Sequence, residues 1–241
     1  RDRSPSRGLG DVYKRQHIRI AVDAVVFGYT GGKLYVLLIQ QRFSGQEPYW
    51  ALPGGLVQDN EPLNDAVKRE LMEETNVKVN YMEQLYTFGD DINRDSRNRV
   101  ISVAYFALID ASKTSIKAST DAENVQWFAV DEIPPLAFDH NLIIQTALER
   151  LRAKLTYQPV GFDLLPELFL FSDLENLYCT ISQKEIDRRN FRKKIMSFGF
   201  IEQTELVSEK KGGRPGKYFK FNKQKYNELS KEGIYFEIKF V

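Results

Sequence analysis

The sequence predicts a two-domain chain of mixed α/β (α+β) class, in which a mixed sheet sandwiched between helices precedes a smaller domain of helices and a strand hairpin. Its 241 residues are enough for two modest domains. The first part alternates strand-like apolar runs with two amphipathic helical patterns. The chain as a whole carries a net charge of +1, but residues 184–225 contain thirteen Lys/Arg against five Asp/Glu. This uneven charge sets the last part of the chain apart from the rest.

Four apolar runs in the first part read as strands. Residues 18–26 and 34–40 are joined by a turn at residues 30–32, which has the sequence Thr-Gly-Gly. Further runs follow at residues 100–109 and 125–130. We predict that these strands form the mixed sheet.

A helix is predicted over residues 140–155, close to the end of the first domain. Asp139 precedes it and can cap its first turn. The residues expected on its buried side are Leu142, Ile143, Thr146, Ala147 and Leu151.

The other helix of this domain follows Pro62 and carries acidic residues on its apolar side. Proline suits the first helical position, and no further Gly or Pro occurs before Val77. At about 100° per residue, Glu70 and Glu74 fall inside the apolar arc and Glu73 lies at its margin. Carboxylates that face the body of a protein are costly unless a cation meets them. Hard divalent ions such as Mg²⁺ meet this need, because they prefer oxygen ligands and often accompany phosphates. The arc itself is formed by Leu63, Ala66, Val67 and Leu71.

The spacing of charged residues in this region resembles the Nudix box, the signature of a family that cleaves nucleoside diphosphates linked to another moiety. The residues that carry the resemblance are Gly55, Glu61, Arg69, Glu70, Glu73 and Glu74. The family expects Gly at position 76, where this chain has Asn76. Asn is the next best residue after Gly in the left-handed conformation that often ends a helix. The alternative, a solvated acidic helix, does not explain carboxylates on the apolar side.

The resemblance implies a role for each residue of the box. Glu70, Glu73 and Glu74 would coordinate Mg²⁺ or Mn²⁺ around a pyrophosphate, with Glu73 and Arg69 as catalytic residues. Arg69 would act by orienting a glutamate through an ion pair. The backbone of Gly54 would approach the metal and that of Gly55 the phosphate of the substrate, which a residue without a Cβ allows. The catalytic base of the family varies in position. Glu123 is a candidate because it precedes the strand at 125–130, and the alternative is an exposed loop charge.

A polar loop carries Arg94, Arg97 and Arg99 within six positions. Arginines can grip a diphosphate by paired hydrogen bonds, and the alternative is a solubilising loop. The run resembles the one in ADP-ribose-type Nudix proteins and in Nudix-related regulators, which implies that these arginines bind substrate. The segment Phe138-Asp139-His140 also resembles those regulators, and His140 is interpreted as a helix-entry or packing residue.

The C-terminal part reads as helices followed by two strands. Ser172 with Glu175, and Ser182 with Glu185, have the form of capping boxes. A basic helix is predicted over residues 184–198, then strands at 200–203 and 218–221, with a basic Gly-rich turn at 210–217 between them. This order is that of a winged helix, whose basic helix enters the major groove while the turn forms the wing.

The winged-helix order predicts binding to operator DNA. Lys and Arg at such positions mainly neutralise phosphates, while Arg189 and Asn190 are the candidates for base edges. The alternative is a solvated turn and a solvated helix face. The predicted DNA-binding residues are Arg188, Arg189, Asn190, Arg192, Lys193, Arg214 and Lys217.

A Nudix domain followed by a winged helix resembles the bacterial Nudix-related transcriptional regulators, over roughly residues 17–225. This resemblance implies a homodimer that binds operator DNA and senses a nucleotide such as ADP-ribose, or a sugar. Several members of the family have degenerate boxes, whereas this chain keeps the carboxylates. Two functions therefore stand: a regulator that senses its nucleotide, with or without cleaving it, and a Mg²⁺-dependent hydrolase of ADP-ribose or a related nucleoside diphosphate.

The composition excludes several kinds of protein. Cys179 is the only cysteine, which excludes a disulfide framework and a cysteine metal cluster. No apolar run is long enough to span a membrane and no secretory signal is visible, so a cytoplasmic protein without membrane partners is expected.

The predicted segments are a disordered or non-native leader at 1–16, the Nudix domain at 17–156, a linker at 157–163, the winged helix at 164–230 and a tail at 231–241.

Overall fold

The computed structural model describes residues 18–41, 47–79, 81–118, 122–209, 215–233 and 236–238. Its N-terminal domain is built on a seven-stranded mixed sheet with the order β3-β2-β1-β6-β5, in which β4 also pairs with β1 and β7 with β2. The long central pair β1 and β6 is parallel and the other pairs are antiparallel. The strands are β1 (Arg19–Thr30), β2 (Lys33–Gln41), β3 (Tyr49–Ala51), β4 (Gly54–Leu56), β5 (Glu83–Phe88), β6 (Val100–Ile109) and β7 (Asn124–Ala129).

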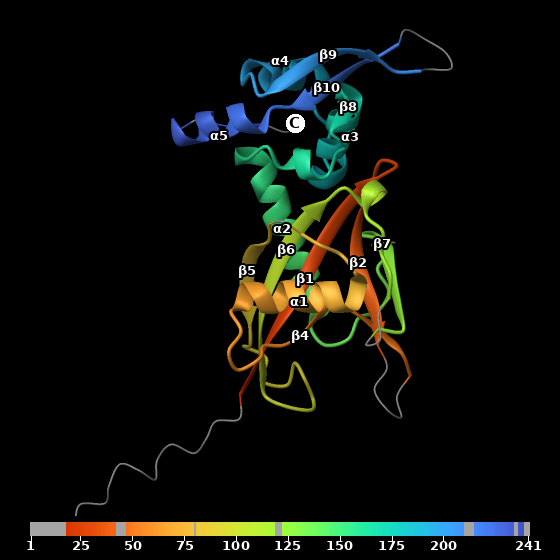
Figure 1. Cartoon of the computed structure of the whole chain (residues 1–241), viewed down its shortest axis with the longest axis vertical. Coiled ribbons are helices and arrows are strands. Elements are labelled where there is room, and N and C mark those ends of the chain that lie inside the picture. Colours follow the sequence, from red (N-terminus) through yellow and green to blue (C-terminus); the bar gives the residue numbers. More distant parts are fainter. Residues whose placement is uncertain are drawn as a thin grey trace, which may run out of the picture.

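Two helices cover the two faces of this sheet (Figure 1). On one face, Val26 of β1 packs in a core with Val67 of α1 (Leu63–Thr75). On the other, its neighbour Val25 packs in a core with Ile143 of α2 (His140–Tyr157). Alternate residues of a strand point to opposite faces, so β1, buried on both sides, contributes to both cores. The predicted sheet between helices is confirmed.

The helix boundaries follow most of the sequence signals. Helix α1 begins at Leu63, and Pro62 occupies the position before it. Asn76 ends α1 in the left-handed conformation, with φ 59° and ψ 21°. Helix α2 begins at His140 as predicted, but the expected burial of Leu142 is wrong, because 54% of its surface is exposed. Ile144 takes its place in the core.

The C-terminal domain packs three helices around a three-stranded sheet of order β8-β10-β9. Aromatic side chains fill its core: the Phe162 and Phe221 rings stack with centroids 3.6 Å apart, and those of Phe198 and Phe200 with centroids 5.5 Å apart. The elements are η3 (Val160–Asp163), β8 (Leu168–Leu170), α3 (Phe171–Ser182), α4 (Arg188–Ser197), β9 (Ile201–Val207), β10 (Lys217–Phe221) and α5 (Lys223–Lys231). The predicted winged-helix order is confirmed for the described residues.

Both predicted capping boxes in this domain are wrong. Helix α3 begins before Ser172, and the Asp173 carboxylate accepts a hydrogen bond of 3.0 Å from the Leu170 N–H. Ser182 is the last residue of α3, so the next helix cannot start there. Helix α4 instead begins at Arg188, and the Asp187 side chain caps it by accepting from the Asn190 N–H at 3.1 Å. The basic helix is therefore shorter than predicted.

The two domains are joined by direct packing as well as by the chain. Helix α2 continues from the sheet into the C-terminal domain (Figure 1), where Arg152 Nε donates to the Ile181 carbonyl at 3.1 Å. On the sheet side, Thr180 Oγ1 donates to the Gly32 carbonyl at 3.1 Å. The segment predicted as a linker, 157–163, contains η3, and its Phe162 lies in the C-terminal core. A single apolar cluster runs through both domains, so a displacement of α2 would change the packing in both of them.

Within the described ranges, no helix is both long enough and apolar enough to cross a bilayer.

Candidate functional site

A small cavity of about 100 Å³ lies where the box meets the arginine loop and the start of α2. Its walls come from segments far apart in the sequence. Gly54 and Gly55 belong to β4, Arg94 and Arg97 to the loop between β5 and β6, and Phe138 to the turn before α2. The fold thus brings together three of the motifs that the sequence singled out.

Both glycines of the box have close contacts: that of Gly54 is with backbone, which cannot move aside, and that of Gly55 is with the carboxylate of Glu70 in its present position. A Cβ on Gly54 would lie 2.2 Å from the Val22 carbonyl oxygen, and one on Gly55 would lie 2.4 Å from Glu70 Oε1. Cβ atoms do not approach other atoms so closely. Gly54 also uses its backbone, because its N–H donates to Glu74 Oε2 at 2.8 Å. β4 therefore lies directly against the carboxylates of α1.

Two carboxylates of α1 face inward, as the helical periodicity predicted. Glu74 is only 3% exposed, and burial raises its pKa to about 8. Its two oxygens accept from the Gly54 N–H and, at 2.6 Å, from Gln41 Nε2. Burial also raises the pKa of Glu70. Carboxylates with perturbed pKa values are a mark of functional sites, and these two lie directly behind Gly54 and Gly55, which line the cavity.

Arg69 joins three carboxylates through ion pairs. Its guanidinium donates to both oxygens of Glu61, at 2.7 and 2.8 Å, and holds the pKa of that carboxyl below its usual range. It also donates to Glu70 at 2.8 Å and to Glu73 at 3.1 Å. Bidentate pairs of this kind fix geometry as well as charge. Arg69 thus positions carboxylates and does not line the cavity.

The carboxylates of α1 are chemically suited to a hard divalent cation, because such ions prefer oxygen ligands. Glu70, Glu73 and Glu74 are the residues that would hold it. Nevertheless, among the described residues no three His, Cys, Asp or Glu side chains converge to hold a metal ion. The reason is visible in the hydrogen bonds: Glu70 and Glu73 face Arg69, and Glu74 faces Gly54.

The start of α2 is tied to the arginine loop by a buried ion pair. Arg94 donates to both carboxylate oxygens of Asp139, at 2.9 and 2.6 Å, and lies 3.6 Å from Asp23. The expectation that Asp139 caps α2 is therefore wrong in one respect. Asp139 occupies the cap position, but its carboxylate makes no capping hydrogen bond. The Arg94 guanidinium attracts it instead.

His140 completes this buried group. Its Nδ1 accepts a hydrogen bond of 2.9 Å from the Leu52 N–H, which leaves the proton of the neutral ring on Nε2, 3.6 Å from Asp23 Oδ1. Burial lowers the pKa of His140, and Ser102 Oγ donates to Asp23 Oδ2. These contacts agree with the interpretation of His140 as a packing residue at the helix entry.

The other arginines of the loop also bond protein oxygens. Arg97 donates to both oxygens of Asp95, at 2.9 and 2.7 Å, and its guanidinium carbon lies 5.2 Å from the centroid of the Phe138 ring. Arg99 donates to the Gly89 carbonyl at 2.7 Å and does not line the cavity. The binding of a diphosphate by Arg94, Arg97 and Arg99 stays a prediction.

Glu123, the candidate base, is exposed just before β7 and lies outside the cavity lining. Its backbone N–H donates to the Gln40 carbonyl at 2.8 Å. Its catalytic role also stays a prediction.

Two residues of the site were missed by sequence reasoning. Asp23 lies at its centre, 8% exposed at the side chain, and Gln41 holds Glu74. Asp23 had a usable signal, because it is the one acid within the apolar run 18–26. Gln41 ends a strand beside other polar residues, and nothing local sets it apart.

The candidate nucleic-acid interface lies on α4 and the strands beside it. Arg188, Arg189, Asn190 and Lys193 are exposed, although Asn190 Nδ2 donates to the capping Asp187 at 2.7 Å. Arg188 Nε is 4.0 Å from Glu175. This helix presents a basic outer surface, as its sequence predicted.

Arg192 and the wing residues differ from the rest of α4. The Arg192 guanidinium carbon lies 4.5 Å from the ring centroid of Phe171 and 5.3 Å from that of Phe219. Lys217 lies 3.9 Å from Glu205 across the hairpin. Arg214 falls outside the described residues. Arg192 therefore packs on the aromatic core while keeping its charge at the surface.

Comparison with known proteins gives this architecture a family. The model of the NUDIX domain matches residues 17–149, and that of the NrtR DNA-binding winged helix domain matches residues 161–221. The chain is 33% identical over 212 residues to the ADPR responsive transcriptional repressor NtrR of Acinetobacter baylyi, an alignment that covers 86% of this chain and 84% of that protein. The chain belongs to the Nudix-related (NrtR) family of transcriptional regulators. The resemblance noted in the sequence is confirmed.

Solved structures of this family extend the likeness to the fold. The crystal structure of Shewanella oneidensis NrtR complexed with a 27mer DNA superposes with a TM-score of 0.73 at 30% identity, covering 92% of this chain and 99% of that one. The NUDIX domain of the same NrtR, complexed with ADP ribose, superposes with a TM-score of 0.50 at 36% identity, covering 55% of this chain and 88% of that one. Both domains of an NrtR regulator are therefore present.

Proposed function

We propose that this chain is a transcriptional repressor that binds operator DNA through its winged helix and ADP-ribose through its Nudix domain. The observation that carries the proposal is the path of α2. Asp139, at the start of the helix, is bonded to Arg94 in the wall of the Nudix cavity. Arg152, near its other end, is bonded to α3 of the winged helix. A ligand in the cavity is thus two contacts away from the DNA-binding domain.

The relatives support both ligands. The A. baylyi relative is named an ADPR responsive repressor, and the S. oneidensis relative was crystallised with DNA and, as its NUDIX domain, with ADP ribose. On the DNA side, exposed basic residues of α4 would neutralise phosphates. A homodimer would place two such helices on the two halves of an operator.

The residues of the cavity suggest how effector binding would affect α2. A diphosphate near Arg97 would compete with Asp95 for the guanidinium, because both are bidentate acceptors. Arg94 lies on the same loop and in the same cavity wall as Arg97, and its guanidinium is paired with Asp139. Effector binding therefore acts on the contacts that hold the start of α2, and repression is relieved when the winged helix shifts.

Operator binding measured by fluorescence anisotropy tests this proposal. The operator is first recovered by selection from random duplexes. We expect tight binding that ADP-ribose weakens, and Arg189→Ala should lower the affinity while Lys231→Ala, on the remote helix α5, should not. A panel of sugars run beside ADP-ribose identifies a sugar effector. If neither ADP-ribose nor a sugar changes the affinity, the sensing role fails.

A second function, hydrolysis, is favoured by the complete set of box glutamates. We propose that the site binds Mg²⁺ or Mn²⁺ and cleaves ADP-ribose slowly while the protein acts as a repressor. Such a cation, when bound, polarises phosphoryl oxygens and activates a water. The chain's own contribution is to hold Glu70 and Glu73 through Arg69 and to line the cavity with Gly55.

Product formation from ADP-ribose, with Mg²⁺ or Mn²⁺ and with EDTA, tests hydrolysis. Glu73→Gln should abolish cleavage and retain operator binding. Glu123→Gln tests the candidate base, and unchanged rates would remove Glu123 from the reaction. Wild-type rates equal to those of Glu73→Gln would show that the site only senses.

A further inference from the structure

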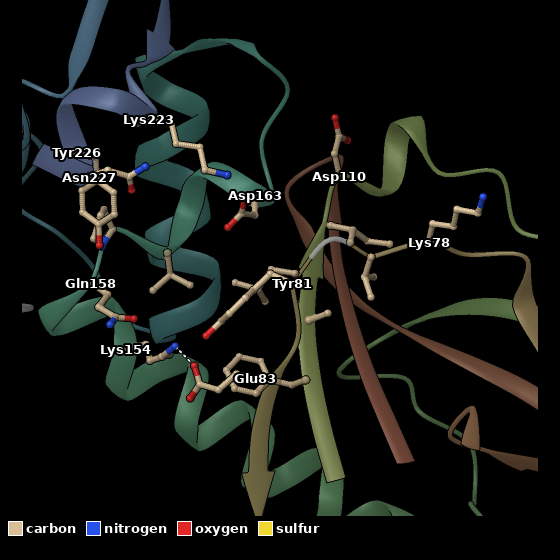
Figure 2. Close-up of a pocket in the computed structure, with 17 residues that line it drawn as sticks. Lys78, Tyr81, Glu83, Asp110, Lys154, Gln158, Asp163, Lys223, Tyr226 and Asn227 are labelled. Carbon is tan, nitrogen blue, oxygen red and sulfur yellow. Dashed lines mark hydrogen bonds and ion pairs between the residues drawn. The ribbon is translucent and has the colours of Figure 1, made fainter. Parts of the chain in front are cut away.

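A second and larger cleft, of about 670 Å³, lies between parts of the two domains (Figure 2). Its walls are β5, β6 and the segment before them on the Nudix side, and η3 and α5 on the winged-helix side, with the end of α2 closing it. None of its lining residues lines the Nudix cavity or belongs to α4. Ligand pockets commonly have this volume and often lie between domains.

At one end of the cleft, two cations share one carboxylate. Glu83 of β5 is paired with both Arg150, at 3.2 Å, and Lys154 of α2. The Lys154 ammonium also lies 5.4 Å from the centroid of the Phe106 ring. Arg150 lies outside the lining, which itself holds three cations, Lys78, Lys154 and Lys223, and three carboxylates, Glu83, Asp110 and Asp163. With Glu83 shared by two cations, the charge of Lys154 is not fully balanced by Glu83. The side chains of Lys154 and Glu83 are 13% and 22% exposed, so the charge is only partly screened by water.

The winged-helix wall adds a further cation. Lys223, the first residue of α5, is exposed and makes no ion pair with any described residue. Figure 2 shows its ammonium directed over the cleft near Asp163 of η3. Lys78 lies at the opposite rim, likewise without an ion pair in the described part of the chain. An acidic ligand group would find a partner on the C-terminal wall.

An aromatic side chain stands in the middle of the cleft. Tyr81 is 73% exposed, and Figure 2 shows it projecting from the Nudix side toward the end of α2. Tyr226 lies on the opposite wall, where its ring packs 5.7 Å from that of Phe221. A planar ring placed against Tyr81 would be stabilised by ring stacking in addition to the apolar area it buries.

A buried acceptor lies on the Nudix wall. Asp110 Oδ2 is buried and receives no hydrogen bond from the described residues, and its nearest cation, Lys113 Nζ, is 3.8 Å away. Buried polar atoms normally have a hydrogen-bond partner. Because Asp110 Oδ2 has almost no accessible surface, a ligand in the cleft does not reach it.

We propose that this interdomain cleft binds a small aromatic anion of the nucleoside monophosphate class. Its acidic group is held by Lys223 and its ring lies against Tyr81. The site is separate from the Nudix cavity. Because its walls belong to both domains, an occupant fixes their relative orientation.

Isothermal titration calorimetry on the full chain with AMP tests the site. We expect saturable binding that Lys223→Ala and Tyr81→Ala each weaken at least tenfold. The matched controls are Lys231→Ala on the same helix and Tyr86→Ala, another exposed tyrosine that does not line the cleft, and both should bind as the wild type. Inorganic phosphate, which has no ring, and adenosine, which has no charge, should each bind more weakly than AMP.

AMP is also part of ADP-ribose, so binding in the Nudix cavity must be separated from binding in the cleft. Arg97→Gln alters the Nudix cavity and leaves the cleft intact. AMP binding that survives Arg97→Gln and is lost in Lys223→Ala supports the proposal. Binding that is lost in Arg97→Gln and unchanged in Lys223→Ala, or no binding of AMP at millimolar concentration, overturns it. Neither result depends on operator binding, so the proposed repressor function can fail or stand independently.

Discussion

Arg94 and Asp139, forty-five positions apart, form a buried bidentate ion pair, with Nε–Oδ2 and Nη2–Oδ1 distances of 2.9 and 2.6 Å. The pair joins the loop between β5 and β6 to the first residue before α2. Only 4% of the Arg94 side chain is exposed, so a strong geometric tie, and not a flexible surface contact, connects the Nudix cavity to the helix that enters the winged helix.

Breaking this pair should destabilise the protein strongly. Arg94→Gln leaves Asp139 and Asp23 without their guanidinium, and removing one partner of a buried pair costs about 3–5 kcal/mol. Arg97→Gln, on the same loop, removes an arginine whose side chain is 45% exposed, so its cost should be at most about 1 kcal/mol. Urea unfolding of the two variants measures the difference. Equal losses would contradict a structural role specific to Arg94.

The pair also explains where sequence reasoning stopped. Asp139 was expected to cap α2 because Asp before a helical pattern is a local signal. The competing partner, Arg94, is distant in sequence, and only the fold shows that they meet. In the same way, Ser172 and Ser182 carry the local form of a cap, while tertiary packing starts α3 and α4 at other residues.

Features set by local periodicity were predictable. The inward position of Glu70 and Glu74 follows from 100° per residue alone, and the left-handed conformation at Asn76 follows from the helix end. Leu142 was misplaced because the buried stripe of α2 is centred on Ile143 and Ile144, which the pattern of apolar residues could not distinguish.

The left-handed conformation of Asn76 predicts different effects on stability for two substitutions at this position. The left-handed backbone costs an ordinary residue about 1–2 kcal/mol, and Asn and Gly less. Asn76→Ala should therefore lower the free energy of unfolding by about 1 kcal/mol, whereas Asn76→Gly should leave it unchanged or raise it slightly. Thermal and urea unfolding of both variants provide the measurement. Equal stability of the Ala and Gly variants would show that φ 59° at this position carries no strain.

His140 should make stability depend on pH below neutrality. Burial lowers the pKa of its folded-state imidazole. As the pH falls, the unfolded chain therefore binds a proton on this residue before the folded protein does. Stability is therefore full above the unfolded pKa of about 6.5 and falls below it, by at most about 1.4 kcal/mol per pH unit.

His140→Asn, whose Oδ1 can still accept from the Leu52 N–H, removes this titration. Urea unfolding at pH 7.5, 6.5 and 5.5 should show a smaller loss in the variant than in the wild type. Glu61 and Asp95, whose pKa values are lowered, take up protons below this window. Glu74, whose pKa burial raises to about 8, takes up a proton within it and stabilises the folded state as the pH falls, in the variant and the wild type alike. The effect of His140 is therefore the difference between the two pH profiles. Parallel pH profiles would mean that another group governs acid stability.

The DNA-binding helix offers a prediction that separates packing from recognition. The Arg192 guanidinium lies over Phe171 and Phe219, so Arg192→Ala removes a cation–π contact worth about 0.5–1 kcal/mol at an exposed site. It also removes the apolar stem that covers the rings. Thermal unfolding should therefore detect this substitution even without DNA.

Arg189 is exposed on the same helix, and no described residue pairs with it in an ion pair. Arg189→Ala should change stability by less than about 0.5 kcal/mol and weaken operator binding. If Arg189 reads a base edge, the loss is about 1–3 kcal/mol and is confined to the cognate operator, whereas a phosphate contact would weaken all duplexes and reduce the salt slope by about one. Anisotropy titrations at several salt concentrations, on selected and random DNA, distinguish these outcomes. If Arg189→Ala lowers the melting temperature and leaves operator binding unchanged, then Arg189, and not Arg192, has the packing role.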